Sequence, residues 1–266
     1  MSTVIFIPAR GGSSRIKNKN IQKVGPYPLI VHTINLAKKI TFADEIFIST
    51  DSEKILNIAK KFSLNPNYKR PKKFATKLSP DYDWIIDAIK FFEKNNQKFE
   101  NFIILRPTNP FRTLKTINKA FKIFKKSNSD SLRAVKLCDQ HPYKMWNIKS
   151  NYLSPLFNKK IQGQPGHSNP YQILPKIYIQ DASLEISKIS NLHKYKNISG
   201  KKIIPFFWIN STIISSIEIK YFSNWHNFFF DFDFSFYKRL KVTVRVVFGV
   251  KFFKIIKRFN VLDNII

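Results

Sequence analysis

A pair of glycines between basic residues is the first group in this sequence whose spacing suits a chemical role. Gly11 and Gly12 follow an apolar run, residues 4–9, and lie between Arg10 and Lys19. Glycines let a backbone approach an anion closely, oriented N–H groups form an anion-binding concavity, and Arg or Lys supplies the countercharge. The stretch therefore predicts a polyphosphate site at the end of a buried strand. A surface turn with solvated basic side chains explains it equally well when the stretch is considered alone.

Two later loops place polar residues after apolar runs in the same way. The run 45–48 ends in Ser-Thr-Asp at residues 49–51, and the run 102–105 ends in a loop with an arginine at each end. Two prolines inside the second loop make it rigid. We expect its two arginines, Arg106 and Arg112, to lie at the same sheet edge as Arg10.

Strand-like and helical patterns alternate along the chain. Short apolar runs predict strands at 4–9, 45–51, 102–105, 131–137, 177–186 and 201–207, and helical spacing predicts helices at 28–37, 52–62, 82–92 and 113–126. This order is typical of an α/β fold with a mostly parallel sheet, helices on both faces and ligands at the carboxyl ends of the strands. The irregular segment 138–176 is long for a loop, which indicates a lid, a ligand-binding arm or an oligomer contact.

The charge balance of the chain is strongly basic. Lys and Arg number 46 against 17 Asp and Glu, a formal net charge of +29, so a nucleic acid, a membrane surface or a polyanionic substrate is a candidate partner. Residue bias is the alternative, because Lys, Asn, Ile and Phe are all abundant. The single cysteine, Cys138, allows no internal disulfide, and the sequence shows neither a secretory leader nor a bilayer-spanning apolar stretch. We expect a cytoplasmic protein with one sizeable domain and an appendage.

Several short motifs follow one another through residues 1–205. They are Ile7-Pro8-Ala9-Arg10-Gly11-Gly12-Ser13 with Lys19-Asn20, Pro28-Leu29-Ile30, Ser49-Thr50-Asp51, Arg70-Pro71, Leu105-Arg106-Pro107-Thr108-Asn109-Pro110-Phe111-Arg112, His141-Pro142-Tyr143-Lys144-Met145, Gln172-Ile173-Leu174-Pro175 and Ile179-Gln180-Asp181-Ala182-Ser183-Leu184-Glu185-Ile186. In order and spacing the set resembles the acylneuraminate cytidylyltransferases (CMP-sialic acid synthetases), including their legionaminic and pseudaminic acid branch. Neither a dinucleotide-binding G-x-G-x-x-G nor a P-loop G-K-[ST] is present, which argues against NAD enzymes and P-loop kinases.

This resemblance implies both a fold and a reaction. The fold would be a Rossmann-like three-layer sandwich of the nucleotide-diphospho-sugar transferase type in residues 1–205, with a dimerisation arm at about 138–176. The protein would be an enzyme, an N-acylneuraminate-type cytidylyltransferase, that transfers CMP from CTP to the anomeric hydroxyl of a nine-carbon acidic sugar and releases pyrophosphate. It would form a homodimer in which the arm reaches into the sugar pocket of the partner subunit.

The resemblance also assigns roles to single residues. Arg10 and Lys19 would be the catalytic cations on the triphosphate. The nucleotide would be held by these two and by Gly11, Gly12, Ser13, Asn20, Arg70 and Ser79, and the sugar by Arg106, Thr108, Gln172 and Asp181. Arginine at position 106, where many members have glutamine, would be able to pair bidentately with a sugar carboxylate. We expect proton transfer from neither His32, within a core helix, nor His141, before a turn proline.

Mg²⁺ is implied as well, and at this point the sequence departs from the family pattern. Family members carry a late Asp-Ile-Asp or Asp-Ile-Asn motif that supplies a metal ligand; its counterpart by spacing is residues 216–220, with Glu218 as the candidate ligand and Lys220 beside it. Lys77 likewise stands where an acidic residue is usual. Residues 206–266 are expected to form a divergent, basic, Phe-rich C-terminal segment.

Alternatives to an active transferase follow from these departures. The first is a catalytically impaired homologue that binds nucleotide or sugar without turnover, because the metal motif is altered. The second is a basic protein that binds a membrane surface or nucleic acid, since residues 238–258 carry eight basic residues and no acidic one. Nucleic acid is not the expected partner, because the charge is spread over the fold without aromatic stacking sites. For the C-terminal segment, loss of an ancestral sequence is favoured over membrane contact or an extra pair of strands.

Overall fold

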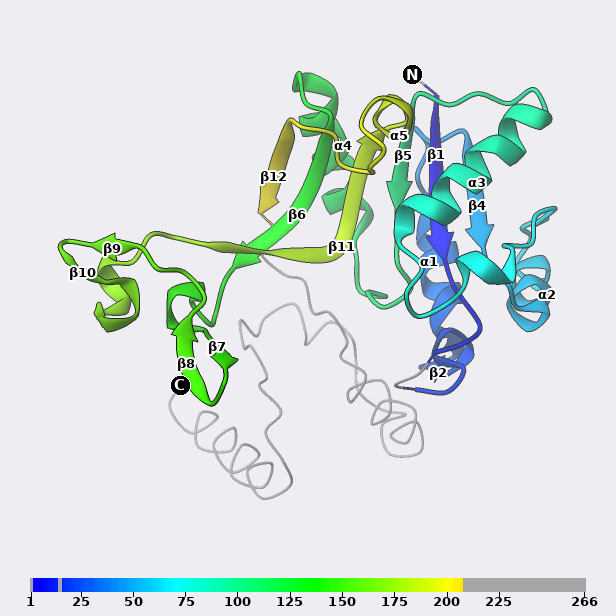
Figure 1. Ribbon diagram of the computed structural model, residues 1–266. Coiled ribbons are helices and arrows are strands. Elements are labelled where there is room, and N and C mark those ends of the chain that lie inside the picture. Colours follow the sequence, from blue (N-terminus) through cyan, green and yellow to red (C-terminus); the bar gives the residue numbers. More distant parts are fainter. Residues whose placement is uncertain (1, 14–15, 208–266) are drawn as a thin grey trace, which may run out of the picture. The chain divides into compact units, whose positions relative to one another are not determined.

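A six-stranded mixed sheet forms the centre of the structure. The computed structural model describes residues 2–13 and 16–207, all of which belong to the first of two units, Met1–Asn224. The strands of the sheet are β1 (Thr3–Pro8), β4 (Glu45–Ser49), β5 (Asn101–Ile104), β6 (Ser131–Leu137), β11 (Tyr178–Lys188) and β12 (Ile203–Phe207). Their order is β12-β6-β11-β5-β1-β4 (Figure 1). β1 is parallel to β4 and β5, and β6 to β12, whereas β11 is antiparallel to β5 and β6. The predicted mostly parallel sheet is therefore confirmed.

Helices cover both faces of this sheet. They are α1 (Leu29–Ala37), α2 (Glu53–Lys61), α3 (Asp81–Lys94), α4 (Leu114–Lys126) and α5 (Ser190–Lys194). Side chains alternate between the faces along β1: Ile5 and Ile7 pack with apolar residues of α1, α2 and α4, whereas Val4 and Phe6 pack with those of α3 and α5. All four are fully buried. Both faces of β1 thus belong to hydrophobic cores, and the predicted three-layer architecture is confirmed.

Aromatic packing beneath α3 fixes a residue that reaches the site. Phe6 of β1 meets Trp84 edge to face with ring centroids 5.5 Å apart, and meets Phe47 of β4 at 5.7 Å. Trp84 is 2% exposed. Edge-to-face pairs of this kind contribute about 0.5–1.5 kcal/mol beyond the burial of apolar area. The hydrophobic core therefore sets the position of the Trp84 indole.

The loop after β4 contacts the glycine loop after β1. Ser52 is the N-cap residue of α2 by position, but its side chain makes no capping hydrogen bond. The neighbouring Asp51 accepts a hydrogen bond from the Gly11 backbone N–H at 2.8 Å. A contact between two loops has replaced a local cap, because the parallel pairing of β1 and β4 brings their carboxyl ends together.

The arm between β6 and β11 is more regular than its sequence suggested. It contains the hairpin β7 (Trp146–Lys149) with β8 (Tyr152–Pro155), the short pair β9 (Lys160–Ile161) with β10 (Gln164–Pro165), and the 3-10 turns η3 (Pro142–Lys144), η4 (Gly166–Ser168) and η5 (Tyr171–Ile173) (Figure 1). Lys144 donates to the backbone oxygens of His167 and Asn169, each at 2.6 Å. These contacts hold successive turns of the arm together.

Short elements complete the described part of the chain. They are η1 (Lys19–Ile21), the paired strands β2 (Lys23–Val24) and β3 (Tyr27–Pro28), and η2 (Lys72–Phe74). Among the helices of residues 2–13 and 16–207, none has the length and apolar character needed to cross a membrane. Of the predicted C-terminal segment 206–266, only Phe206 and Phe207, at the end of β12, are described; Glu218 and the basic stretch lie outside the described residues.

Candidate active site

A pocket of about 220 Å³ opens at the carboxyl ends of β1 and β5. It is lined by Pro8, Arg10, Ser13, Lys19, Asn20, Arg70, Phe74, Thr76, Ser79, Asp81, Trp84, Arg106, Pro107 and Thr108. The structure thus brings together eight of the predicted site residues, namely Arg10, Ser13, Lys19, Asn20, Arg70, Ser79, Arg106 and Thr108. Four of these described lining residues are cationic and one lining residue, Asp81, is acidic. This local excess of positive charge suits a polyanion such as a nucleoside triphosphate.

The glycine loop is held by contacts that the sequence did not reveal. The Gly11 N–H donates to Asp51, so this amide is already occupied, and a Cβ at position 11 would lie 3.0 Å from Cβ of Ser52. Asn20 donates to the backbone oxygen of Arg10 at 3.2 Å. Gly11 lines only a small cavity that shares Arg10 and Asn20 with the pocket, and Gly12 lines neither. The Gly11 amide is therefore not open to an anion, whereas binding of a phosphate by the Gly12 amide stays a prediction. From this loop the pocket receives Arg10, Ser13, Lys19 and Asn20.

A second loop, residues 73–79, contacts the side chain of Arg10. The Arg10 guanidinium donates to the backbone oxygen of Thr76. Ser79 accepts from the Thr76 N–H at 3.1 Å and donates to the Lys73 backbone oxygen at 3.0 Å. Ser79 thus closes this loop through its hydroxyl, and the loop in turn orients Arg10 at the pocket wall.

Arg70 is a buried cation whose partners carry no charge. Its Nε donates to Ser49 Oγ and its Nη2 to the Ser49 backbone oxygen, both at 2.8 Å, and its guanidinium carbon lies 4.6 Å from the centre of the Trp84 ring. Burial lowers the pKa of Arg70 to about 10. A hydroxyl, a carbonyl and a ring face orient the guanidinium without neutralising it, so its charge remains available to an anion.

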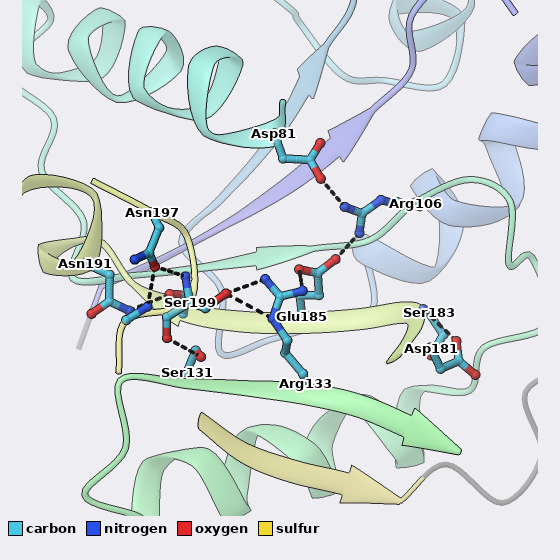
Figure 2. Close-up of polar contacts among 12 residues, drawn as sticks. Asp81, Arg106, Ser131, Arg133, Asp181, Ser183, Glu185, Asn191, Asn197 and Ser199 are labelled. Atoms are coloured by element: carbon cyan, nitrogen blue, oxygen red, sulfur yellow. Dashed lines mark hydrogen bonds and ion pairs between the residues drawn. The ribbon is translucent and has the colours of Figure 1, made fainter. Parts of the chain in front are cut away.

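Arg106 lies in an alternating network of charges (Figure 2). Its two terminal nitrogens pair with Asp81 and with Glu185, and Glu185 also pairs with Arg133 at 2.7 Å. Arg133 in turn donates to Ser199 Oγ at 2.6 Å. Desolvation by burial opposes the charge of Arg106, but the two carboxylates prevail and raise its pKa. A bidentate contact of Arg106 with a sugar carboxylate stays a prediction. Such a contact would require Arg106 to break its ion pair with Asp81 or with Glu185.

Arg112, expected at the same sheet edge as Arg10, is buried and does not line the pocket. It is 4% exposed, and it donates to the backbone oxygens of Ser183 at 2.6 Å and Arg106 at 2.7 Å and to the hydroxyl of Thr33 at 3.1 Å. Burial lowers the pKa of Arg112 to about 9. It joins the loop after β5 to β11 and α1, and it is not among the residues that line the pocket.

Two residues expected at the sugar lie away from the pocket of their own chain. Gln172 is exposed on η5 of the arm. Asp181 is buried in β11, where its carboxylate accepts from the Ser183 N–H at 2.9 Å, next to a register shift between Gln180 and Glu185. Neither lines the pocket described above. A role of either residue in sugar binding stays a prediction.

Proton-transfer and metal groups are sparse in the described site. The His32 ring contacts the Val24 backbone oxygen at 2.6 Å, and the His141 ring contacts the Pro175 backbone oxygen at 2.9 Å, so both rings are engaged elsewhere in the fold. Within residues 2–13 and 16–207, no group of three or more His, Cys, Asp or Glu side chains is arranged to hold a metal ion. Asp81, the acid of the pocket, is committed to Arg106. These residues alone do not fit a Mg²⁺ centre.

Comparison with known proteins identifies the family of the chain. The model of a family described as cytidylyltransferase matches residues 4–198. The chain belongs to the cytidylyltransferase family. The post-translational flagellin modification protein B of Campylobacter coli is 31% identical over 77% of this chain and 86% of its own. The CMP-N,N'-diacetyllegionaminic acid synthase of Legionella pneumophila is 30% identical over 68% of this chain and 79% of its own.

Solved structures agree on the fold of this cytidylyltransferase. A CMP:2-keto-3-deoxy-manno-octonic acid synthetase in complex with CTP superimposes with a TM-score of 0.57 at 13% identity, over 79% of this chain and 91% of that one. A 4-diphosphocytidyl-2C-methyl-D-erythritol synthase from Anaerococcus prevotii superimposes with a TM-score of 0.54 at 13% identity, over 85% of this chain and 98% of that one. At this identity the likeness concerns the fold, a Rossmann-like sheet of the nucleotidyltransferase type.

Sequence reasoning did not assign six residues of the pocket wall, namely Pro8, Phe74, Thr76, Asp81, Trp84 and Pro107. A signal for two of them was present. Asp81 and Trp84 lie two and five residues after Ser79, and Asp81 directly precedes the predicted helix 82–92, so the first turn of that helix begins beside the pocket. Glu185, which anchors Arg106 from β11, left no such signal.

Proposed function

We propose that this cytidylyltransferase transfers CMP from CTP to the anomeric hydroxyl of a nine-carbon acidic sugar and releases pyrophosphate. The observation that carries the proposal is the convergence of Arg10, Lys19, Arg70 and Arg106 on one pocket at the carboxyl edge of the sheet. Relatives named for legionaminic, pseudaminic and N-acylneuraminic acids support an acidic sugar as the acceptor.

Positioning and charge stabilisation would supply the catalysis. The acceptor hydroxyl attacks the α-phosphate directly, so the side chains need to align the two substrates and stabilise the negative charge that develops on the phosphates. We assign Arg10, Lys19 and Arg70 to the triphosphate, since they come from the loops after β1 and α2. One preorganised donor of this kind contributes about 3–4 kcal/mol in the transition state. Arg106 and Thr108, after β5, border the acceptor.

Magnesium enters the proposal with the nucleotide. Phosphate oxygens are ligands that Mg²⁺ prefers, and the ion would screen the charge of the triphosphate. The described residues offer no ligand cluster for it, and the candidate ligand Glu218 lies outside them. We therefore assign no catalytic step to a protein-bound metal; omission of Mg²⁺ from the assay tests the requirement.

Dimerisation through the arm is proposed as well. Apolar side chains of the β7–β8 hairpin are strongly exposed in the single chain: Ile148 by 77%, Leu153 by 64% and Tyr152 by 79%. An exposed apolar patch of this kind is typical of a protein interface. We propose that Gln172, exposed on the same arm, then reaches the partner's pocket. Sedimentation equilibrium should give twice the mass of the chain, and Ile148→Lys should give the monomer.

Pyrophosphate release tests the function directly. The purified protein is assayed with CTP and Mg²⁺ against sialic, legionaminic and pseudaminic acids. Release with one acid and none without acceptor is the expected result, and it also identifies the substrate. Folded protein that binds CTP but releases no pyrophosphate with any acid would contradict transferase activity and favour the impaired homologue. Strong salt-dependent binding to DNA or anionic vesicles without CTP binding would favour the basic-surface alternative.

A further inference from the structure

We propose that Asp81 is a positioning residue that fixes the orientation of the cations on both sides of the pocket. The inference rests on the proposed function, because it assigns the nucleotide to the Arg70 side and the acceptor to the Arg106 side. Asp81 is the acid among the described residues that line the pocket, and its two carboxylate oxygens have different partners.

The first oxygen of Asp81 acts on the nucleotide side. Oδ1 accepts from Trp84 Nε1 at 2.8 Å. The face of the same indole carries Arg70, whose guanidinium carbon lies 4.6 Å from the ring centre. The hydrogen bond therefore fixes the rotation of the ring on which Arg70 stacks, and the geometry of Arg70 depends on Asp81 through Trp84.

The second oxygen acts on the acceptor side. Oδ2 pairs with one terminal nitrogen of Arg106, and Glu185 holds the other (Figure 2). Glu185 has a side-chain exposure of 4% and is itself paired with Arg133, so this end of the network is fixed within the sheet. Two anchors on opposite sides define the plane of a guanidinium, whereas one leaves it free to turn. Asp81 supplies the second anchor, at the pocket surface.

The start of α3 gives Asp81 its rigidity. Asp81 is the first residue of the helix, where a negative charge interacts favourably with the helix dipole. Trp84, one turn later, is buried against Phe6. A carboxylate on a helix that is anchored in the core can hold two cationic groups in a constant relation, which a loop residue would do less well.

For Asp81→Asn, an effect of charge alone and an effect of side-chain orientation would change CTP affinity in opposite directions. The substitution removes a negative charge from a pocket with four cations, so an effect of charge alone would tighten the binding of CTP. If Asp81 acts by position, CTP binding instead weakens by about threefold to tenfold and kcat falls by about tenfold or more, because the single amide oxygen of Asn is able to accept from the charged Arg106 or from Trp84 but not from both, and the other group loses its fixed orientation. The sign of the change in CTP affinity therefore separates the two.

The matched control is Asp83→Asn, which removes the same charge from the same helical turn but concerns a residue that does not line the pocket. CTP dissociation constants are measured by calorimetry, kcat and KM by pyrophosphate release, and folding by thermal denaturation. Asp83→Asn should change the dissociation constant and kcat by less than about twofold, as for a surface charge. Once Arg106 is replaced by Gln, addition of Asp81→Asn should lower kcat by no more than about twofold further, because the amide oxygen of Asn is then free to accept from Trp84 and the Arg106 contact is already lost.

Tighter or unchanged CTP binding in Asp81→Asn would overturn the inference, as would a loss of thermal stability with unchanged kcat and CTP affinity. If the unaltered protein releases no pyrophosphate with any acid, the proposed function fails, but the comparison of CTP affinity between Asp81→Asn and Asp83→Asn still decides whether Asp81 positions the nucleotide side.

Discussion

Replacement of Arg70 by Met should separate stability from nucleotide binding. Burial lowers the pKa of Arg70 from its ordinary range to about 10, which corresponds to about 3 kcal/mol of unfavourable free energy for the buried charge. The penalty is fully present at pH 7, below both pKa values, and is relieved only as the pH rises through this range. Against it stand two hydrogen bonds to Ser49, at about 1 kcal/mol each, and the contact with Trp84, at about 1 kcal/mol.

These opposing contributions nearly cancel, so Arg70→Met should change the free energy of unfolding by no more than about 1 kcal/mol. CTP binding should respond differently, because a charge-assisted hydrogen bond to phosphate contributes about 1.5–3 kcal/mol. A loss of this size weakens binding roughly 10- to 150-fold. Urea denaturation monitors the first quantity and calorimetric titration with CTP the second.

Lys69→Met is the control for the Arg70 experiment. Lys69 is adjacent in sequence and half exposed, and it pairs with Glu53 at the surface. Its loss removes the same charge and should change the free energy of unfolding by at most about 1 kcal/mol and CTP affinity by less than about twofold. The reasoning would be refuted if Arg70→Met lowered the free energy of unfolding by more than about 3 kcal/mol but left CTP affinity unchanged. Arg70 would then be a cation that stabilises the fold and does not bind the nucleotide.

Three further predictions concern the catalytic cation, a turn and the arm. Lys19→Ala should retain the fold by circular dichroism but release pyrophosphate about a hundredfold more slowly or worse; unchanged kinetics would contradict its assignment. Asp130 accepts from the N–H groups of Lys201 and Lys202, both at 2.8 Å, which lowers its pKa, so Asp130→Asn should be about 1–2 kcal/mol less stable in urea at pH 7. This deficit should shrink as the pH falls from the ordinary pKa of an aspartate, about 4, through the lowered pKa of the folded chain, because the unfolded chain takes up the proton first; a constant deficit would exclude the carboxylate as its cause. A Cβ at Gly166 would clash with the Tyr143 ring. Gly166→Ala should therefore speed amide hydrogen exchange in residues 138–177 without altering CTP affinity. Exchange protection equal to that of the unaltered chain would show that the arm accommodates the methyl group.

Local pattern was sufficient to predict the layers of the fold. The apolar run of β1 is buried on both faces, as a continuous hydrophobic strand in a covered sheet must be, and α4 shows the spacing of a helix with one buried face. Motif resemblance then predicted much of the pocket wall. The apolar pattern and the motifs are both visible in the sequence because the burial of a strand and the position of a loop depend on residues that are close along the chain.

Long-range pairing could not be predicted in the same way. Arg106 and Arg112 bracket one rigid loop, yet the first faces carboxylates at the pocket and the second is buried among backbone oxygens. What distinguishes them is β11, which inserts antiparallel between β5 and β6 and presents Glu185 to one arginine and the Ser183 carbonyl to the other. No local pattern shows that a strand more than seventy residues later will lie there.

The net charge of +29 is by itself a poor guide to function, because part of it lies on exposed residues that line no described pocket. Lys115, Lys119 and Lys122 are exposed along α4, which has no acidic residue in its first turn, and no described pocket residue comes from that helix. The pocket differs in that its cations are oriented: Arg10 by a carbonyl, Arg70 by a hydroxyl and a ring, Arg106 by two carboxylates. A solvated lysine must lose side-chain entropy and reorganise water when it meets a phosphate, whereas a cation already held in place does not. Asp81 reduces the charge of the pocket by one unit, and we infer that this loss is outweighed by the orientation it gives to the cations on either side.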